Sequence, residues 1–351
     1  MATGDDTSHA VGHGRSERVR YGNTDLYVSR ICQGTAFRNM PRSADNEVGL
    51  RVLKTCLDEG LNFFDTAPGY GGGGAEKLLG KAIAGRRDQA VIANRVINVA
   101  VPDGAKEGDE SQLARYTRDY VLRATEWSLK RLGTDYLDIL SIHLKDGLDA
   151  HREGGQQRVD LYMRRFKDTA PTPPDQITDT MDALVKSGKI RYWGLSQHNR
   201  QDVDEYLETA AATGKAPIAS LQNNYSLLSR GRQTEALFGL IRKAGLGVQT
   251  IGPHAAGRLV PGCAAEPGSA HADLLAVLDR VAAELGVPRS QVCVAWVLSH
   301  PELTTALAGA ESPEHVKDNL AAAALELPAE AMDALNAASE RYRQRTQSQA
   351  G

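Results

Sequence analysis

The segment NFFDTAPGYGGGGAEKLLGKAI, residues 62–83, contains a strand, a turn and a helix in close succession. The apolar pair Phe63 and Phe64 is typical of a buried strand, and the strand ends in Asp65. Tyr70 lies in the turn, and four glycines, residues 71–74, come between it and the helical spacing of the apolar residues that follow. The segment therefore predicts an acid and a phenol close together at the end of a strand.

The same unit repeats along the chain. Amphipathic helical segments such as 46–60, 118–133 and 175–189 alternate with short β-rich runs, and several helices stop at a glycine, which can adopt the left-handed conformation that ends a helix. The eight candidate strands are SRICQGTA (29–36), NFFDTA (62–67), AVIANRV (90–96), LDILSIH (137–143), RYWGLSQ (191–197), ASLQNNY (219–225), GVQTIG (247–252) and TTALAGA (304–310). Eight such units favour an α/β fold, a single-domain (β/α)8 TIM barrel. The alternative is an open doubly wound sheet, but no glycine-rich dinucleotide fingerprint follows the first strand.

Length and composition agree with one large domain. The chain has 351 residues, is 41% hydrophobic and carries a net charge of -3, which gives no sign of attraction to nucleic acid or membranes. We expect a disordered tail at 1–17, the barrel at 18–343 with an extra helix near its end, and a flexible tail at 344–351. The N-terminus lacks the apolar run of a secretory signal, and the four cysteines show no ligand spacing. A cytoplasmic protein with reduced thiols and no metal is therefore expected.

Polar side chains stand at the ends of five successive predicted strands. In a parallel barrel the carboxyl ends of the strands meet at one mouth, where working residues gather. One polar residue there is commonly structural, whereas five together favour a functional site. The five residues are Asp65, Arg95, His143, Ser196 and Gln222.

These blocks resemble the aldo-keto reductase family. The likeness rests on GLNFFDTAPGYGGGGAEKLLGKAI (60–83), DYLDILSIH (135–143), GKIRYWGLSQHN (188–199), SLQNNYSLLSR (220–230) and the block from residue 286 to 322, and it spans roughly residues 18–340 in the family's order. It implies a (β/α)8 barrel that binds a nicotinamide dinucleotide and reduces aldehydes and ketones.

The resemblance also assigns roles at the strand ends. It implies that Tyr70 donates the proton, that His143 orients the carbonyl and that Asp65 anchors a cation. A cation beside the phenol would lower its pKa, which is about 10 in a free tyrosine. The family has a lysine at the end of the third strand, and Arg95 occupies that place here. Arginine keeps the charge but spreads it over a bulkier fork.

The exchange of lysine for Arg95 leaves alternatives open. One is a barrel that binds the cofactor but turns over weakly, or that regulates without catalysis. Another is a redox-neutral enzyme that uses a bound cofactor.

The resemblance transfers a set of cofactor contacts. Ser196, Gln197 and Gln222 match positions that bind the nicotinamide carboxamide, and Ile251 stands where many members place a stacking aromatic residue. Gly34, Thr35 and Asp65 are also expected to contact the cofactor. The pyrophosphate and adenosine ends are expected near Gly252, Pro253, Gly257, Arg258, Gly309, His315 and Asn319. Family habit implies NADPH. Glu311 argues for NADH, because a carboxylate repels a 2′-phosphate and can accept from a ribose hydroxyl.

The substrate is expected to be a small carbonyl compound. Sugars, quinones, aromatic aldehydes and polyketide-type ketones stay open, and so does a place in bacterial secondary or sugar metabolism. The long connection after His143, residues 144–174, includes a helical apolar stripe at 159–166. That stripe is expected to cap the pocket, to make a homo-oligomer contact or to lie on the barrel.

Overall fold

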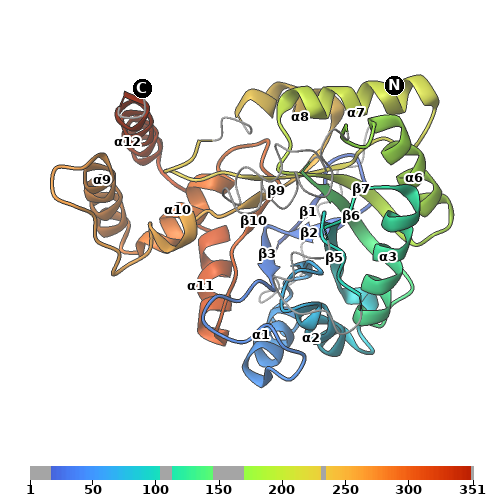
Figure 1. Cartoon of the computed structure of the whole chain (residues 1–351). Helices are drawn as coiled ribbons and strands as arrows, with labels where there is room; N and C mark the ends of the chain where they lie inside the picture. The colour runs from blue at the N-terminus through green and yellow to red at the C-terminus, as the bar shows by residue number, and fades with distance from the viewer. Residues whose placement is uncertain (1–16, 103–112, 145–169, 231–234, 349–351) are drawn as a thin grey trace, which may run out of the picture.

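Eight parallel strands close into a barrel in the computed structural model, which describes residues 17–102, 113–144, 170–230 and 235–348 (Figure 1). The order around the barrel follows the chain, and the last strand pairs with the first. Each predicted run overlaps one barrel strand, so the predicted (β/α)8 barrel is confirmed. The strands are β3 (Ile31–Gly34), β4 (Phe63–Asp65), β5 (Val91–Val96), β6 (Leu137–His143), β7 (Ile190–Ser196), β8 (Ser220–Asn224), β9 (Gly247–Ile251) and β10 (Thr305–Leu307).

Helices surround the barrel and join its strands. Their ends follow the local sequence: Thr117 caps the start of α3, and Gly133 ends it in the left-handed conformation. The joining helices are α1 (Glu47–Asp58), α2 (Gly74–Ile83), α3 (Arg118–Leu132), α6 (Pro174–Lys186), α7 (Arg200–Thr213), α8 (Phe238–Ala244), α10 (Arg289–Leu298) and α11 (Pro313–Ala323), with short 3-10 turns η1 (Arg87–Gln89), η3 (Glu235–Leu237) and η4 (Ala255–Gly257).

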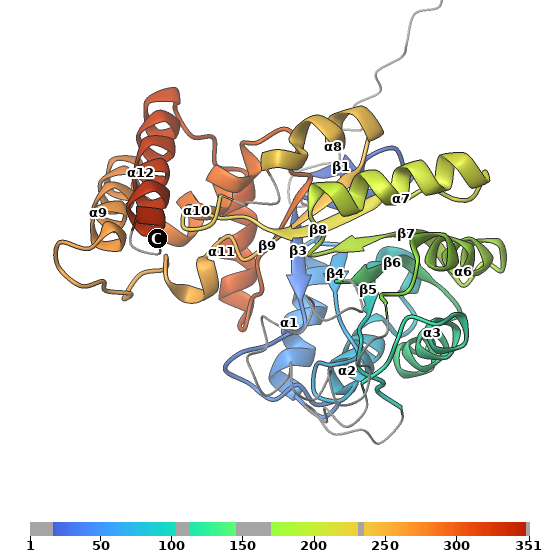
Figure 2. The ribbon, with the colours of Figure 1, turned by 45° about the horizontal axis from the view of Figure 1, so that its top comes forward.

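Two further helices, α9 (Ala270–Leu285) and α12 (Ala329–Ser348), pack against each other at one side of the barrel (Figure 1; Figure 2). Helix α12 is the expected extra helix, but it continues through residues 344–348, which were predicted to belong to a flexible tail. The prediction placed the boundary too early. Arg345 holds the last turn, since its guanidinium donates to the carbonyl of Gly268 at 2.8 Å.

An antiparallel hairpin, which the sequence reasoning missed, precedes the barrel. It consists of β1 (Arg18–Arg20) and β2 (Tyr27–Ser29). Tyr21, in its turn, is fully buried, stacks edge-on against Phe63 and hydrogen-bonds Ser220 at 2.8 Å. Because Phe63 and Ser220 begin their strands, the hairpin covers the amino-terminal end of the barrel and leaves the carboxyl ends as the open mouth.

The predicted stripe at 159–166 lies outside the described residues. Within the described ranges, no helix is both long enough and apolar enough to span a lipid bilayer.

Candidate active site

The strand register brings polar residues into one row at the mouth. His143 is paired with Ser196, Ser196 with Gln222, and Gln222 with Gln249 on the next strand. On the other side of the barrel, Asp65 is paired with Gly34. The five strand ends chosen from the sequence thus share one mouth, as predicted.

Asp65 and Arg95 form a buried ion pair. One terminal nitrogen of Arg95 donates to both carboxylate oxygens of Asp65, and the two residues are 6% and 2% exposed. Burial raises the pKa of Asp65, and the positive charge of Arg95 opposes that rise. Arg95, at the strand position where the resemblance implies a lysine, therefore binds the Asp65 carboxylate through both of its oxygens.

Tyr70 lies next to this pair. The Cζ atom of Arg95 is 5.6 Å from the centre of the Tyr70 ring, within the range of a cation–π contact. Burial raises the pKa of the Tyr70 phenol above its ordinary value, while Arg95 and Arg42 act in the opposite direction. This differs from the expected lowered pKa: the cations only offset part of the desolvation.

Gln222 connects the acid to the cofactor side of the mouth. Its Nε2 donates to Asp65 at 2.7 Å and also to Gln249, while its Oε1 accepts from the Ser196 hydroxyl at 2.9 Å. Gln249 in turn donates to the Cys32 sulfur at 2.8 Å. Sequence reasoning missed Gln249, although a glutamine inside the apolar run GVQTIG was a usable signal.

Two residues that follow site residues are strained. Leu144 and Gln197 have φ angles of 60° and 62°, in the left-handed region that side chains rarely adopt. Backbone hydrogen bonds hold both: the Leu144 amide donates to Ser196 and the Gln197 amide to Gln222, each at 2.9 Å. Such strain is typical of functional sites. The carbonyl of His143 accepts from the Tyr116 hydroxyl at 2.5 Å, which fixes the end of β6.

The loop after β9 carries the predicted pyrophosphate residues. Ile251 ends the strand half-buried, Pro253 is buried, and Arg258 is exposed. Gly252 and Gly257 have φ angles of 70° and 89°, and a Cβ added at either would meet nothing within 4 Å. The loop therefore has a glycine backbone beside open space.

The start of α11 carries the predicted adenosine end. Ser312 caps the helix by accepting from the amide of His315, and Asn319 donates to the carbonyl of Ala308 at 2.9 Å. A Cβ on Gly309 would meet only the carbonyl oxygen of Gly34, at 4.0 Å. Open space therefore lies beside Gly309, near the ends of β3 and β10, next to a helix N-terminus that favours anions.

Glu311 is placed differently from the expectation. Its carboxylate accepts from the backbone amides of Arg38 and Asn39, at 2.5 and 3.1 Å, and from the Asn39 side chain at 2.7 Å. The expected partner was a ribose hydroxyl, since a carboxylate repels a 2′-phosphate. The physical reason for the difference is that three donors on the segment after β3 already satisfy the acid.

The donor set fits a nicotinamide dinucleotide. Ser196 and Gln222 offer hydroxyl and amide groups of the kind that bind a carboxamide, and the Oε1 of Gln222 keeps a second lone pair. The open glycine backbone at Gly252, Gly257 and Gly309 leaves room for close approach of a phosphate. The predicted residues therefore line the mouth from β7 around to α11, with Glu311 turned to the segment after β3.

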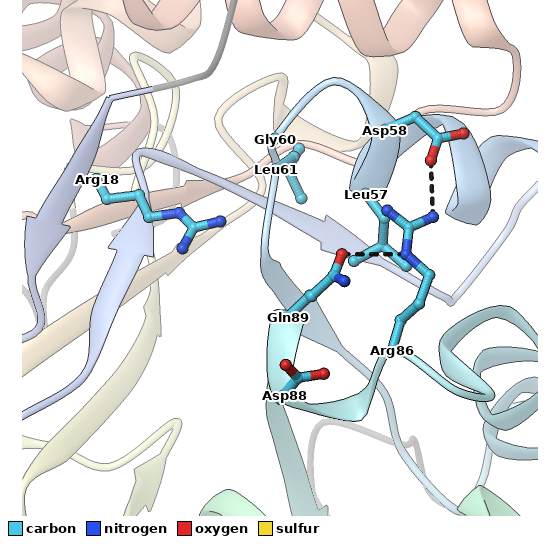
Figure 3. A pocket seen from close by; sticks show the side chains of 8 residues that line it. All are labelled: Arg18, Leu57, Asp58, Gly60, Leu61, Arg86, Asp88 and Gln89. Atoms are coloured by element: carbon cyan, nitrogen blue, oxygen red, sulfur yellow. Dashed lines mark hydrogen bonds and ion pairs between the residues drawn. The ribbon is translucent and has the colours of Figure 1, made fainter. Parts of the chain in front are cut away.

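A separate cavity lies at the other end of the barrel (Figure 3). It has a volume of about 470 Å³, and its lining includes Arg18, Asp58, Arg86 and Gln89. Arg86 spans it by donating to Asp58 at 2.7 Å and to Gln89 at 3.1 Å. Since Gln89 precedes β5, this cavity is on the amino-terminal side and is not part of the mouth.

The sequence and the fold were compared with those of known proteins. The Aldo/keto reductase family model matches residues 30–340. The chain is 30% identical over 338 residues to the uncharacterized oxidoreductase YrpG of Bacillus subtilis, covering 91% of this chain and 95% of that protein. It is 27% identical to the NADH-specific methylglyoxal reductase of Escherichia coli, covering 87% and 93%. The holo form of aldo-keto reductase AKR11C1 from Bacillus halodurans superposes with a TM-score of 0.73 at 27% identity, covering 92% and 96%.

The fold and mouth thus define an NAD(P)-dependent oxidoreductase built on a parallel barrel. The chain belongs to the aldo-keto reductase family. Its general activity is carbonyl reduction.

Proposed function

We propose that the chain reduces an aldehyde or ketone with NADPH and that Tyr70 donates the proton. The observation that carries the proposal is the group of Asp65, Arg95 and Tyr70 at one end of the barrel, with an ion pair beside a half-buried phenol. Reduction builds negative charge on the carbonyl oxygen, and a phenol next to a cation can hydrogen-bond that oxygen and protonate it. His143, which ends the adjacent strand β6, would orient the carbonyl.

The reduced nicotinamide, when bound, supplies a hydride to the carbonyl carbon. Ser196, Gln197 and Gln222 would hold its carboxamide, and Ile251 would offer an apolar face. Because Gln222 also donates to Asp65, the same side chain would couple cofactor position to the acid that anchors Arg95. Arg95 would keep its charge throughout, so that the phenolate formed after proton transfer remains stabilised.

NADPH is proposed over NADH because of the placement of Glu311. The sequence argument for NADH required a carboxylate that faces the ribose, but three hydrogen bonds from Arg38 and Asn39 engage this one. His315 stands in the first turn of α11, and its positive form would favour a 2′-phosphate. The NADH-specific relative from Escherichia coli makes a direct comparison of the two cofactors necessary.

The test is a titration of the protein with NADPH and NADH, followed by turnover on a panel of carbonyl compounds with product identification by mass. The panel contains sugars, quinones, aromatic aldehydes and polyketide-type ketones. The expected result is tighter binding of NADPH and an alcohol product for at least one class. Cofactor binding without any alcohol product would instead support a regulatory barrel, and a product of unchanged oxidation state would support a redox-neutral enzyme.

A further inference from the structure

A second arginine, Arg42, lies against the ring of Tyr70. Its Cζ is 5.9 Å from the ring centre, nearly the same distance as the Cζ of Arg95 at 5.6 Å. Both distances fall within the range in which a guanidinium is attracted to an aromatic ring. Tyr70 therefore has two cationic neighbours, one from strand β5 and one from the segment between β3 and α1.

The segment that carries Arg42 is held at several points. The Nε of Arg42 donates to the carbonyl of Phe37 at 2.9 Å, and Phe37 is buried. Asn46, which caps α1, donates from its side chain to the carbonyl of Pro41 at 2.7 Å. The Glu311 bonds fasten the beginning of the same segment. Arg42 is thus a positioned side chain on a segment that is tied to both neighbouring elements.

The glycines after Tyr70 make room for this segment. A Cβ on Gly71 would lie 1.9 Å from the carbonyl oxygen of Arg42, and a Cβ on Gly74 would lie 2.2 Å from it. Both distances are far below a normal contact, so no other residue fits at either position without moving the backbone. The turn that presents Tyr70 and the segment that presents Arg42 are therefore packed directly against each other.

The charges around the phenol favour its ionised form. Asp65 on β4 contributes one negative charge, while Arg95 on β5 and Arg42 contribute one positive charge each, so these three charges sum to +1. His143 ends the next strand, β6, and the Cys32 thiol on β3 is close enough to interact with Asp65 and Arg95, so both are further titratable groups near this set. A net positive set beside a phenol stabilises the phenolate relative to the neutral form.

We propose that Arg42 is a positioning residue for carbonyl reduction, acting as a second cation that holds the Tyr70 ring and stabilises its phenolate beside Arg95. The inference rests on the proposed role of Tyr70 as proton donor. It also gives a physical reason why arginine can replace lysine at position 95. The guanidinium of Arg95 donates to both oxygens of Asp65, so the carboxylate offsets its positive charge. Arg42 then supplies a second positive charge beside the phenol.

The experiment measures the titration of Tyr70 itself. The protein is labelled with 3-fluorotyrosine, and the fluorine resonance of Tyr70 is assigned as the one lost in Tyr70→Phe. The variants are Arg42→Gln, Arg42→Lys and, as the matched control, Arg51→Gln on the exposed face of α1. We expect Arg42→Gln to raise the pKa of Tyr70 by about one unit or more. Arg42→Lys should shift it less, because it keeps the charge, and Arg51→Gln should leave it unchanged.

Turnover is measured on the same proteins as kcat/KM against pH. As the pH rises, kcat/KM should fall when Tyr70 loses its proton. In Arg42→Gln this fall should shift to higher pH by the same amount as the pKa of Tyr70 measured by fluorine titration. The two proposals fail in different ways. An unshifted fluorine titration in both Arg42 variants, or an equal shift in Arg51→Gln, would overturn the role of Arg42 alone. Full turnover by Tyr70→Phe would overturn the proton donor and, with it, the role of Arg42 in reduction.

Discussion

Arg95 donates to both carboxylate oxygens of Asp65 through a single terminal nitrogen, and the pair lies buried at the mouth of the barrel. This geometry makes the two residues one electrostatic unit. Removing either partner would leave an uncompensated buried charge. The effect of Arg95 on Tyr70 therefore cannot be separated from its effect on Asp65 by a single substitution.

The first prediction uses a pair of variants for that reason. Arg95→Met alone should lower the free energy of unfolding by about 3–5 kcal/mol, because Asp65 stays buried and unpaired. Adding Asp65→Asn should recover much of that loss. Both proteins should reduce carbonyls more slowly. The fall of kcat/KM with rising pH should shift to higher pH in Arg95→Met, since one of the two cations beside Tyr70 is gone, and should shift less in the double variant, which also loses the negative charge of Asp65.

Denaturant unfolding and the pH profile of kcat/KM check this prediction, with Arg95→Lys as the variant that keeps the charge. We expect Arg95→Lys to retain or raise reduction, because an ammonium is compact and can approach the phenol. Weaker substrate binding without any gain in the chemical step would show that Arg95 instead grips the substrate. Coincident profiles for the wild type and Arg95→Met would mean that Arg95 does not tune Tyr70.

The second prediction concerns the glycine turn. Gly71 and Gly85 both have positive φ angles, of 63° and 74°, but only Gly71 lies against another backbone. Gly85→Ala should cost about 1–2 kcal/mol, the usual cost of a left-handed alanine. Gly71→Ala should cost about 1–3 kcal/mol more, because it must push Arg42 away. Thermal or denaturant unfolding compares the two, and equal losses would contradict the close packing of the turn.

The third prediction concerns Glu311 and pH. Burial raises the pKa of Glu311, but the hydrogen bonds from Arg38 and Asn39 outweigh that effect and leave it below its ordinary value. A depressed folded pKa gives stability that is present above the unfolded pKa of about 4.3 and is lost as the pH falls through the folded value. The wild type should therefore be more stable than Glu311→Gln at pH 7, with the gap closing below about pH 4.

Unfolding curves at several pH values test this, with Glu330→Gln at the exposed start of α12 as the control. A gap between wild type and Glu311→Gln that stays constant with pH would show that the carboxylate charge is not used. The same variant tests the cofactor proposal: Glu311→Gln should change NADPH and NADH binding alike, since the carboxylate is held by Arg38 and Asn39 on the segment after β3.

The barrel could be predicted from sequence because each strand and helix has a recognisable pattern of apolar residues in its own segment. Strands such as NFFDTA and LDILSIH end in a polar residue, and parallel strands bring those ends together whatever the intervening loops do. The same logic placed Asp65, Arg95 and Gln222 at one mouth. The hairpin at 18–29 was missed because its strands are three residues each and its burial depends on Tyr21 reaching Phe63 and Ser220, far along the chain.

Side-chain partners were harder to predict than positions. Glu311 could be placed at the start of α11, but its engagement with Arg38 and Asn39 depends on how two distant loops meet. Arg42 could not be recognised from the sequence, since it belongs to an irregular segment without the spacing of apolar residues that marks a helix or a strand. The four glycines were visible in the sequence, whereas the close contact of Gly71 and Gly74 with Arg42 required the packed structure.

The central claim is that Tyr70 protonates the carbonyl, and the rate of NADPH oxidation in a single turnover tests it most directly. The measurement compares wild type with Tyr70→Phe, using a substrate found in the carbonyl panel, and a parallel titration gives the dissociation constant of NADPH. The account predicts a loss of about two to four orders of magnitude in rate with a nearly unchanged dissociation constant. A Tyr70→Phe protein that oxidises NADPH at the wild-type rate while forming the same alcohol would contradict it.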